Sequence, residues 1–451
     1  MRLRSSFLMA TELTNYSGLS EPSLPEVHSS VRISRSPLYW RRLLGFMGPG
    51  FLISVGYMDP GNWATDIAGG SRFGYTLLFV IMASNLMAIL LQSLSLKLGI
   101  ATERDLAQAC RESSGRAMSF VLWVMAEVAI AACDMAEVIG SAIALQLLFH
   151  IPLFYGVLIT GLDVLLILLL QRWGFRYIEA LVIALIGTIV ALFGIQMVLS
   201  RPEYWPVFTN LLIPSKEIVS NPGMLYIAIG ILGATVMPHN LYLHSSIVQS
   251  RRYKRTPEGK REAIQMASID SALALTVALF VNAAILIVAA AVFHRSGHFE
   301  VAAIEDAYKL LSPLVGAAGA STLFAIALLA SGQNSSITGT LAGQVVMEGF
   351  IHLKLSPWLR RLITRSIAII PTIIVVAVNG EKGTEKLLLL SQVILSLQLS
   401  FAVVPLVMFT GNRKKMGEFV NPPWVKVLSW AVASLIVALN GWFLVLMIKG
   451  S

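Results

Sequence analysis

The sequence predicts an all-α polytopic membrane protein with about eleven transmembrane helices. Three observations lead to this fold class: 56% of the 451 residues are hydrophobic, only 13% are charged, and long apolar stretches recur along the chain. A soluble protein carries about a quarter charged residues and roughly 45–50% apolar ones. The apolar surface is therefore more than one water-soluble core could bury, and most of it must face lipid.

Each spanning helix needs about 20 mostly apolar residues to cross a hydrocarbon core of about 30 Å. The predicted spans are 46–70, 75–98, 118–149, 153–171, 176–199, 223–248, 267–293, 315–349, 362–379, 386–410 and 425–447. Residues 1–43 are polar and rich in Ser and Pro, which predicts a disordered cytoplasmic tail without a cleavable signal peptide. Residues 44–451 form the membrane domain.

The basic residues orient these spans. Most of the 34 Lys and Arg residues fall in the N-terminal tail and in alternate loops. The positive-inside rule therefore predicts a cytoplasmic N-terminus and, with an odd number of spans, a C-terminus outside. The net charge of +9 is explained by topology and implies no nucleic-acid partner. The two cysteines, Cys110 in a loop and Cys133 in an apolar helix, predict no disulfide framework.

Two of the spans are interrupted by proline. The first contains Asp59-Pro60-Gly61-Asn62, and the sixth contains Met237-Pro238-His239. Broken segments at corresponding places, five spans apart, indicate the binding site of a transporter built from inverted repeats. The predicted repeats cover about 46–199 and 223–410, and the span at 425–447 is an extra helix.

Each proline frees a backbone oxygen, because proline has no N–H for the carbonyl four residues earlier. Pro60 frees the carbonyl of Gly56, and Pro238 frees that of Ala234. An unpaired carbonyl in hydrocarbon costs several kcal/mol unless something satisfies it, and a bound cation can do so. The breaks therefore predict a cation site.

Nearby side chains supply further ligands. Proline kinks and single methionines are usually structural, but a charge at the bilayer centre costs at least about 2.5–3.5 kcal/mol, which makes Asp59 a functional candidate. Gln392 in the tenth span either closes over the cation or makes an interhelical hydrogen bond. The predicted metal ligands are Asp59, Asn62, Met237, Ala234, Gly56 and Gln392.

Titratable groups on other helices suggest a proton route. Three carboxyls on the third span fall broadly on one face, and such chains mark proton relays. His239 either carries a proton or hydrogen-bonds the broken backbone. His244 is a weaker ligand candidate, and Asp163 and Asn282 are interpreted as structural. The predicted proton-pathway residues are Asp59, His239, Glu137, Asp134, Glu127 and Arg361.

No Walker-type phosphate-binding segment is present, so no ATPase subunit is implied and the energy would come from an ion gradient. No enzymatic activity and no resident cofactor are expected. The expected partners are a divalent metal ion, protons and the lipid bilayer.

Together with the stretch from Gly332 to Phe350, the two proline motifs resemble the signatures of the Nramp family of divalent metal transporters. The resemblance runs from about Leu44 to the C-terminus. It implies a LeuT-like fold of two five-helix inverted repeats with an eleventh helix. The expected location is the cell (inner or plasma) membrane, and the short tails suit a bacterial inner membrane. Relatives often have Ala where this chain has Gly56, and members that carry Mg²⁺ lack the methionine found here as Met237.

The resemblance also implies roles for these residues. Asp59, Asn62, Met237 and the span-six carbonyl would bind Mn²⁺ or Fe²⁺, and protons would be co-transported with Asp59, His239 and the span-three acids on or near their route. Two alternatives stay open: an ion-coupled amino-acid or amine symporter of the same fold, and a metal-binding membrane sensor or channel. An acid beside a thioether suits a bare cation better than an amine.

Overall fold

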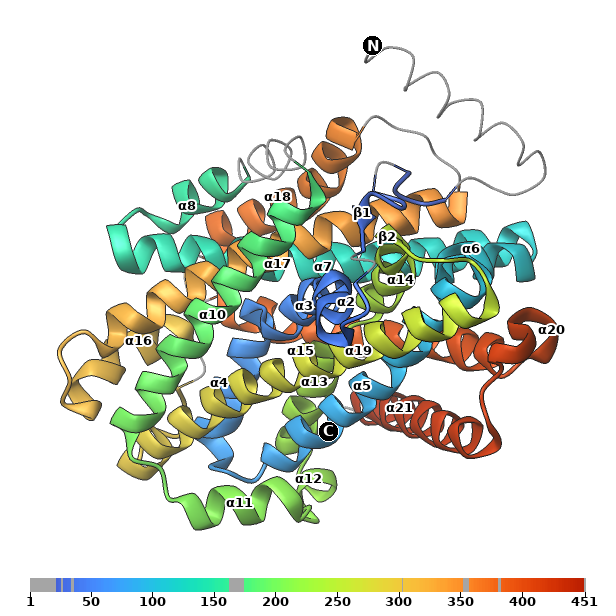
Figure 1. The fold of residues 1–451 in the computed structure, drawn as a ribbon. Helices are drawn as coiled ribbons and strands as arrows, with labels where there is room; N and C mark the ends of the chain where they lie inside the picture. Colours follow the sequence, from blue (N-terminus) through green and yellow to red (C-terminus); the bar gives the residue numbers. More distant parts are fainter. Residues whose placement is uncertain are drawn as a thin grey trace.

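The computed structural model describes residues 22–25, 27–33, 36–161, 174–301, 303–351, 357–379 and 383–449. Apart from two short strands, β1 (Val31–Arg32) and β2 (Arg251–Arg252), the regular elements in these ranges are helices (Figure 1). Figure 1 shows them packed side by side in one bundle. The predicted all-α class is confirmed.

The helices at the predicted spans are α3 (Pro49–Ser54), η1 (Val55–Met58), α4 (Pro60–Phe73), α5 (Leu78–Thr102), α7 (Arg116–Phe149), α8 (Leu153–Thr160), α10 (Phe175–Ser200), α13 (Pro222–Val236), α14 (Pro238–Ile247), α15 (Pro257–Val292), α17 (Ala320–Ile351), α18 (Pro357–Asn379), α19 (Thr384–Thr410) and α21 (Pro423–Lys449). The shorter helices between them are α2 (Tyr39–Phe46), α6 (Leu106–Ser113), α11 (Tyr204–Leu212), α12 (Glu217–Ser220), η2 (Val248–Ser250), η3 (His294–Ser296), α16 (Ile304–Val315), α20 (Arg413–Met416) and η5 (Gly417–Phe419).

Seven helical stretches within the described residues are long and apolar enough to cross a membrane. The first span is shorter because it is broken, and its apolar half covers Pro49–Met58. The fourth predicted span, 153–171, is described only as far as residue 161, and Asp163 lies outside the described residues. The eighth, α17, has ample length but carries buried polar side chains such as Ser331, Asn334 and Gln344. The polytopic membrane class is confirmed.

Proline and capping side chains fix where several helices begin. Pro222 and Pro257 each occupy the first turn of a helix, where the missing N–H costs nothing. The side chains of Asn221 and Thr256 accept hydrogen bonds from backbone N–H groups of these same turns. Asp105 and Gln108 form a reciprocal capping box at the start of α6.

The spanning helices divide into two groups by their packing. Group one contains α3, α4, α5, α13, α14 and α15. In it, α15 packs against α3, α4 and α5, and α5 packs against α13 and α14, while α14 also packs against α17 of the second group. Group two contains α7, α8, α17 and α18, with α7 and α17 in the closest contact of all. Each group takes equivalent helices from both predicted repeats, which agrees with an inverted-repeat architecture.

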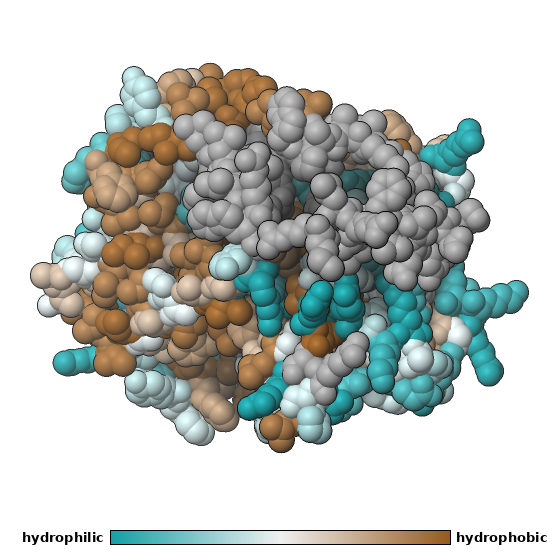
Figure 2. All heavy atoms as spheres, turned by 45° about the horizontal axis from the view of Figure 1, so that its top comes forward, coloured by the Kyte–Doolittle hydropathy of each residue, from teal (hydrophilic) through white to brown (hydrophobic). Residues whose placement is uncertain are grey.

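Large side chains lock the groups together in the interior and face lipid outside. Trp63 of α4 is fully buried, and its ring meets Phe193 of α10 and Phe324 of α17 edge-on, at centroid distances of 4.9 and 5.1 Å. On the periphery, Trp424 and Trp442 of α21 are exposed. Figure 2 shows hydrophobic residues covering one broad side, with hydrophilic side chains gathered on the other. Exposed apolar surface of this extent is suited to lipid.

Part of the N-terminal tail is attached to the bundle. Leu24 and Val27 are buried, and Val31 and Arg32 pair in parallel with Arg251 and Arg252. Helix α2 then begins at residue 39. The expectation of a disordered tail through residue 43 is therefore wrong for residues 22–25, 27–33 and 39–43. Their few apolar side chains fill grooves of the bundle, and the sequence pattern carries no sign of this.

Candidate metal site

The first predicted interruption is confirmed. Helix α3 ends at Ser54, a 3₁₀ turn follows, and Asp59 has extended backbone with φ −71° and ψ 166°. Pro60 then starts α4, and the Oδ1 atom of Asp59 accepts a hydrogen bond from the backbone N–H of Asn62 at 2.7 Å. Asp59 therefore caps α4 with one carboxylate oxygen and keeps the other, Oδ2, for a different partner.

Side chains from other helices hold the carbonyls of the broken segment. Asn282 of α15 donates its amide to the carbonyl of Tyr57 at 2.8 Å, and Trp63 donates its indole N–H to that of Met58 at 3.2 Å. Ser331 of α17 also donates to the Met58 carbonyl. Asn282 was expected to be structural, and its role is to satisfy the carbonyl of Tyr57, because its amide replaces a helical hydrogen bond that the break removes.

The second predicted interruption is confirmed as well. Helix α13 ends at Val236, Met237 has φ 18° and ψ 109°, and Pro238 starts α14. The backbone N–H of Met237 still reaches the carbonyl of Gly233 at 3.3 Å. Ala234 lies in the last turn of α13 and is fully buried. The chain therefore changes direction at Met237, the residue that carries the thioether.

The two breaks meet. A Cβ atom at position 56 would collide with the amide nitrogen of Asn240 in α14, so in this chain the side chain of Asn240 lies directly against the backbone of the first break. The same amide nitrogen lies 3.7 Å from the sulfur of Met237. Asn240 therefore connects the first break to the second. This residue directly follows the Met237-Pro238-His239 motif, and it was not predicted as a site residue.

Helix α19 closes over the breaks. The side-chain amide of Gln392 lies on the backbone of Gly61, where a Cβ atom would overlap it. The backbone carbonyl of Gln392 lies similarly close to Gly233, next to Ala234. All six predicted ligands are thus brought together around the breaks: Asp59, Asn62, Met237, Ala234, Gly56 and Gln392.

Several polar atoms at this centre are uncommitted. Among the described residues, Asn62 Oδ1 and Gln392 Oε1 have no hydrogen-bond partner, although both residues are at most 1% exposed. Buried polar atoms are normally paired, and each exception needs an explanation. Two unpartnered amide oxygens in the same buried region as a carboxylate and a thioether are suitable ligands for a cation. The described part of the chain holds no group of three or more His, Cys, Asp and Glu side chains arranged for a metal, so a metal would depend on this mixed set.

The acids of α7 extend from the centre. The Sγ atom of Cys133 lies 3.8 Å from Oδ2 of Asp59 and 3.6 Å from Oε1 of Glu137, so the thiol bridges the two carboxyl groups. Asp134 lies beside Glu137, since both approach the same backbone position of α17, Gly339, within 2.6 and 3.2 Å of where its Cβ atom would be. Cys133 was not predicted as a site residue, and its position between two acids is a product of packing.

Other predicted proton-route residues are less connected. Glu127 accepts a hydrogen bond from the indole N–H of Trp123, one turn away on α7, at 3.0 Å. His239 is buried, and neither ring nitrogen has a partner among the described residues. The side chain of Arg361 lies outside the described residues. His244 is held by Gln92 at 2.9 Å, which in turn donates to Tyr57 at 2.7 Å, so this histidine supports the first break.

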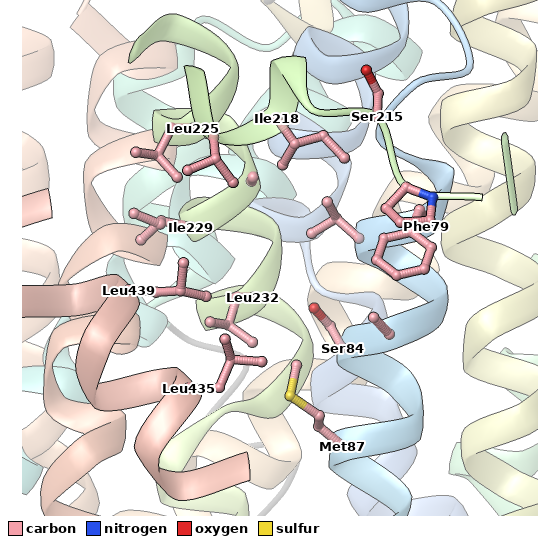
Figure 3. A pocket seen from close by; sticks show the side chains of 15 residues that line it. Phe79, Ser84, Met87, Ser215, Ile218, Leu225, Ile229, Leu232, Leu435 and Leu439 are labelled. Atoms are coloured by element: carbon pink, nitrogen blue, oxygen red, sulfur yellow. The ribbon is translucent and has the colours of Figure 1, made fainter. Parts of the chain in front are cut away.

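The open pockets lie elsewhere. One of about 220 Å³ is enclosed by α5, α12, α13 and α21, and Figure 3 shows Leu225, Ile229, Leu232, Leu435 and Leu439 around it. It offers almost no polar atoms and therefore suits lipid chains better than ions. The candidate metal site itself is closed to solvent on every side, because Asp59, Gln392 and Met237 are all 0% exposed.

Two broken helices around a buried polar centre, within two interlocking groups of apolar helices, define a transporter of the LeuT-like class. The family model described as natural resistance-associated macrophage protein-like, Nramp, matches residues 50–446. The chain belongs to the Nramp family. The predicted family and the predicted non-enzymatic, metal-transporting class of membrane protein are thereby confirmed.

Individual relatives agree with this assignment. The divalent metal cation transporter MntH of Nostoc sp. is 64% identical over 425 residues, which cover 94% of this chain and 96% of the relative. A solved Eremococcus coleocola manganese transporter is 46% identical, with a TM-score of 0.86 over 93% of this chain and 90% of that one. The nucleobase-cation-symport-1 family transporter Mhp1, 14% identical with a TM-score of 0.60 over 88% of this chain and 92% of that chain, shares the fold alone.

Proposed function

We propose that this protein imports divalent transition-metal ions, Mn²⁺ and Fe²⁺ among them, by alternating access coupled to proton movement. The observation that carries the proposal is the burial, at two helix breaks that contact each other through Asn240, of a carboxylate, a thioether and two amide oxygens without hydrogen-bond partners. The relative from Nostoc is named a divalent metal cation transporter and the one from Eremococcus a manganese transporter, and both names support a divalent metal ion as the transported substrate.

The ligand chemistry favours transition metals. Asp59 offsets part of the cation's charge, and Asn62, Gln392 and the freed carbonyls of Gly56 and Ala234 contribute neutral oxygens. Ca²⁺ and Mg²⁺ prefer sites made only of oxygen. A thioether such as that of Met237 is a soft ligand, and it shifts the preference toward Mn²⁺, Fe²⁺, Co²⁺ or Cd²⁺.

The proposed proton route starts at Asp59, the carboxyl group that binds the metal. When the metal binds ionised Asp59, the proton of that carboxyl group must leave, and Cys133 and Glu137 are the groups next to Oδ2. Asp134 follows at the contact with Gly339. In this proposal Glu127 and Arg361 continue the route toward the cytoplasm, and His239 exchanges protons beside the second break.

Alternating access follows from the two helix groups. The site is closed to solvent, so this conformation is an occluded one in which neither side of the membrane reaches the metal. Rocking of group one against group two would expose the site first to one side and then to the other. The N-terminus lies in the cytoplasm and the C-terminus outside, as the distribution of Lys and Arg indicates.

The test is metal uptake by proteoliposomes. We expect accumulation of Mn²⁺ that rises with an inward proton gradient, and loss of that accumulation in Asp59→Asn. Asp306→Asn is the matched control, since Asp306 is an exposed carboxyl group that pairs with the neighbouring Lys309 on the surface. Normal uptake by Asp59→Asn would refute the site assignment, and uptake that ignores the proton gradient would refute the coupling.

The same preparation separates the metal from an organic substrate. An amino-acid or amine symporter needs a cavity for its substrate, and the pocket beside Leu225 and Leu435 and the one beside Tyr75 and His294 both lie away from the breaks. Calorimetry with Mn²⁺ against a panel of amino acids should give heat for Mn²⁺ alone. Heat from an amino acid, lost in Asp59→Asn, would favour the symporter.

A further inference from the structure

The segment of residues 22–25 and 27–33 lies across the face of the bundle that the proposed orientation makes cytoplasmic. We call it the N-terminal strap. Figure 1 shows its strand β1 beside β2. Three of its apolar side chains, Leu24, Val27 and Val31, are buried. A segment of polar composition does not bury its few apolar side chains unless the bundle provides an apolar surface for them.

One side of the strap is bound to group one. Strand β1 pairs in parallel with β2, which follows directly on α14 and η2, in the register Val31 to Arg251 and Arg32 to Arg252. The backbone N–H of Ser29 donates to the carbonyl of Gln249 in η2 at 3.0 Å. These are main-chain bonds, so they add a short strand to an exposed edge in the manner of peptide recognition by strand addition.

The other end of the strap is bound to group two, and it also contacts α14 of group one, because the hydroxyl of Ser246 donates to the carbonyl of Ser23 at 3.4 Å. The backbone N–H of Leu24 donates to Oε2 of Glu348 at 2.8 Å. Glu348 belongs to the last turns of α17, whose backbone carbonyl at Gly349 also accepts a hydrogen bond from Arg111 of α6. A bond to a carboxylate is stronger than one between neutral groups. The strap therefore connects α14 and α17 from the cytoplasmic side.

We propose that the N-terminal strap is a latch that holds the cytoplasmic ends of the two helix groups together and must release before the metal site opens to the cytoplasm. The inference rests on the proposed alternating access, in which group one and group two separate at that end. In the closed state the latch connects β2 to Glu348. When group one and group two separate, the hydrogen bonds of the latch to one of the two groups must break. The latch thus favours the closed inner gate.

The test uses Cys133 as a reporter. In a Cys110→Ser background, Cys133 is the remaining thiol of the chain, and it lies buried next to Asp59. A membrane-impermeant maleimide applied to the cytoplasmic side of inside-out vesicles labels it only when the inner gate opens. In Leu24→Asp, a carboxylate replaces the buried leucine next to Glu348, and its repulsion should release the latch. Ser30→Asp places the same charge on an exposed residue of the same segment and is the control.

We expect Leu24→Asp to raise the labelling rate of Cys133 at least about fivefold, the effect of losing about 1 kcal/mol of closed-state stability. Ser30→Asp should match the parent. Deletion of residues 2–33 removes the strap without placing a charge in the bundle, and it should act like Leu24→Asp. Calorimetry with Mn²⁺ verifies that each variant is folded.

An unchanged or slower labelling rate in both Leu24→Asp and the deletion would overturn the latch. That outcome is distinct from failure of the proposed function, because Mn²⁺ uptake by the parent and its loss in Asp59→Asn are measured independently of the strap. A parent that takes up no Mn²⁺, yet shows faster labelling without the strap, would retain the latch and refute the importer.

Discussion

The side-chain amide of Gln392 rests directly on the backbone of Gly61, in the place where any other residue would carry its Cβ atom. The side chain of Gln392 can therefore occupy this position only because residue 61 has no side chain. This contact holds the side chain of Gln392, whose amide oxygen has no hydrogen-bond partner, against the residue that precedes Asn62. The packing of one glycine thus decides whether the tenth span contributes to the candidate metal site.

Replacing Gly61 with Ala should weaken Mn²⁺ binding by about tenfold or more, because the new methyl group must displace Gln392 from the closed position. Isothermal calorimetry on the purified protein measures the dissociation constant. Gly441→Ala in α21 is the control, since a Cβ atom there meets nothing within 4 Å. Equal affinity in the two variants would show that Gln392 is no ligand.

Replacing Met237 with Ala should reduce the discrimination between Mn²⁺ and Ca²⁺, because the remaining ligands are all oxygen atoms that suit Ca²⁺. Competition by Ca²⁺ against Mn²⁺ uptake into proteoliposomes measures this. Met408→Ala removes an exposed methionine far along α19 and should leave the competition unchanged. If Ca²⁺ competes equally in all three proteins, the thioether does not select the ion.

Replacing Glu179 with Ala should lower the free energy of unfolding by about 3–5 kcal/mol, because it leaves the guanidinium group of Arg251 buried without its carboxylate. The two groups lie 2.8 Å apart and are at most 2% exposed. Thermal unfolding in detergent gives the comparison. The pair of Arg42 and Glu262 is partly exposed, so Glu262→Ala should cost at most about 1 kcal/mol. A small effect in both would show that the buried pair is dispensable.

Acidification should loosen the N-terminal strap through His28. Burial and the nearby charge of Arg255 lower the pKa of His28 below its usual 6.5, against the opposing effect of Glu103. Once the strap is released, His28 returns to its ordinary pKa. The released state therefore binds more protons as the pH falls through 6.5, and docking weakens until the pH passes the lowered pKa of the docked state.

The measurement is the labelling rate of Cys133 from the cytoplasmic side, taken as the ratio of the parent to His28→Gln. This ratio should rise between about pH 7.5 and about pH 5.5. The ratio removes the effect of pH on the thiol and on the acids of α7, which both proteins share. A ratio independent of pH would mean that His28 does not control the strap.

The two breaks could be predicted from the sequence because their signal is local. Proline within an apolar stretch removes a hydrogen bond wherever the helix lies, and a carboxylate at Asp59 is costly in any membrane. Cys133, Asn240 and Asn282 carry no such signal. Each acquires its partner from a helix distant in the chain, so only the packed structure reveals what it contacts.

The N-terminal strap could not be predicted for a related reason. Its composition is polar, and Leu24, Val27 and Val31 are spaced three and four residues apart, which suits a helix and not the turns and short strand that form. Such a composition predicts disorder. The strap is ordered by grooves and an exposed strand edge that other segments create, and local sequence pattern holds no information about them.

An ion between Asp59 and Met237 is surrounded by protein on every side, since neither residue has any exposed surface. In the proposed site these buried groups would take the place of the ion's water, so the ion would give up most of its water before the helices close. Mg²⁺ sheds water reluctantly, whereas larger divalent ions exchange theirs more easily. Under the proposed function, dehydration would select ions at the entrance, and the sulfur of Met237 would then favour some of those that have lost their water.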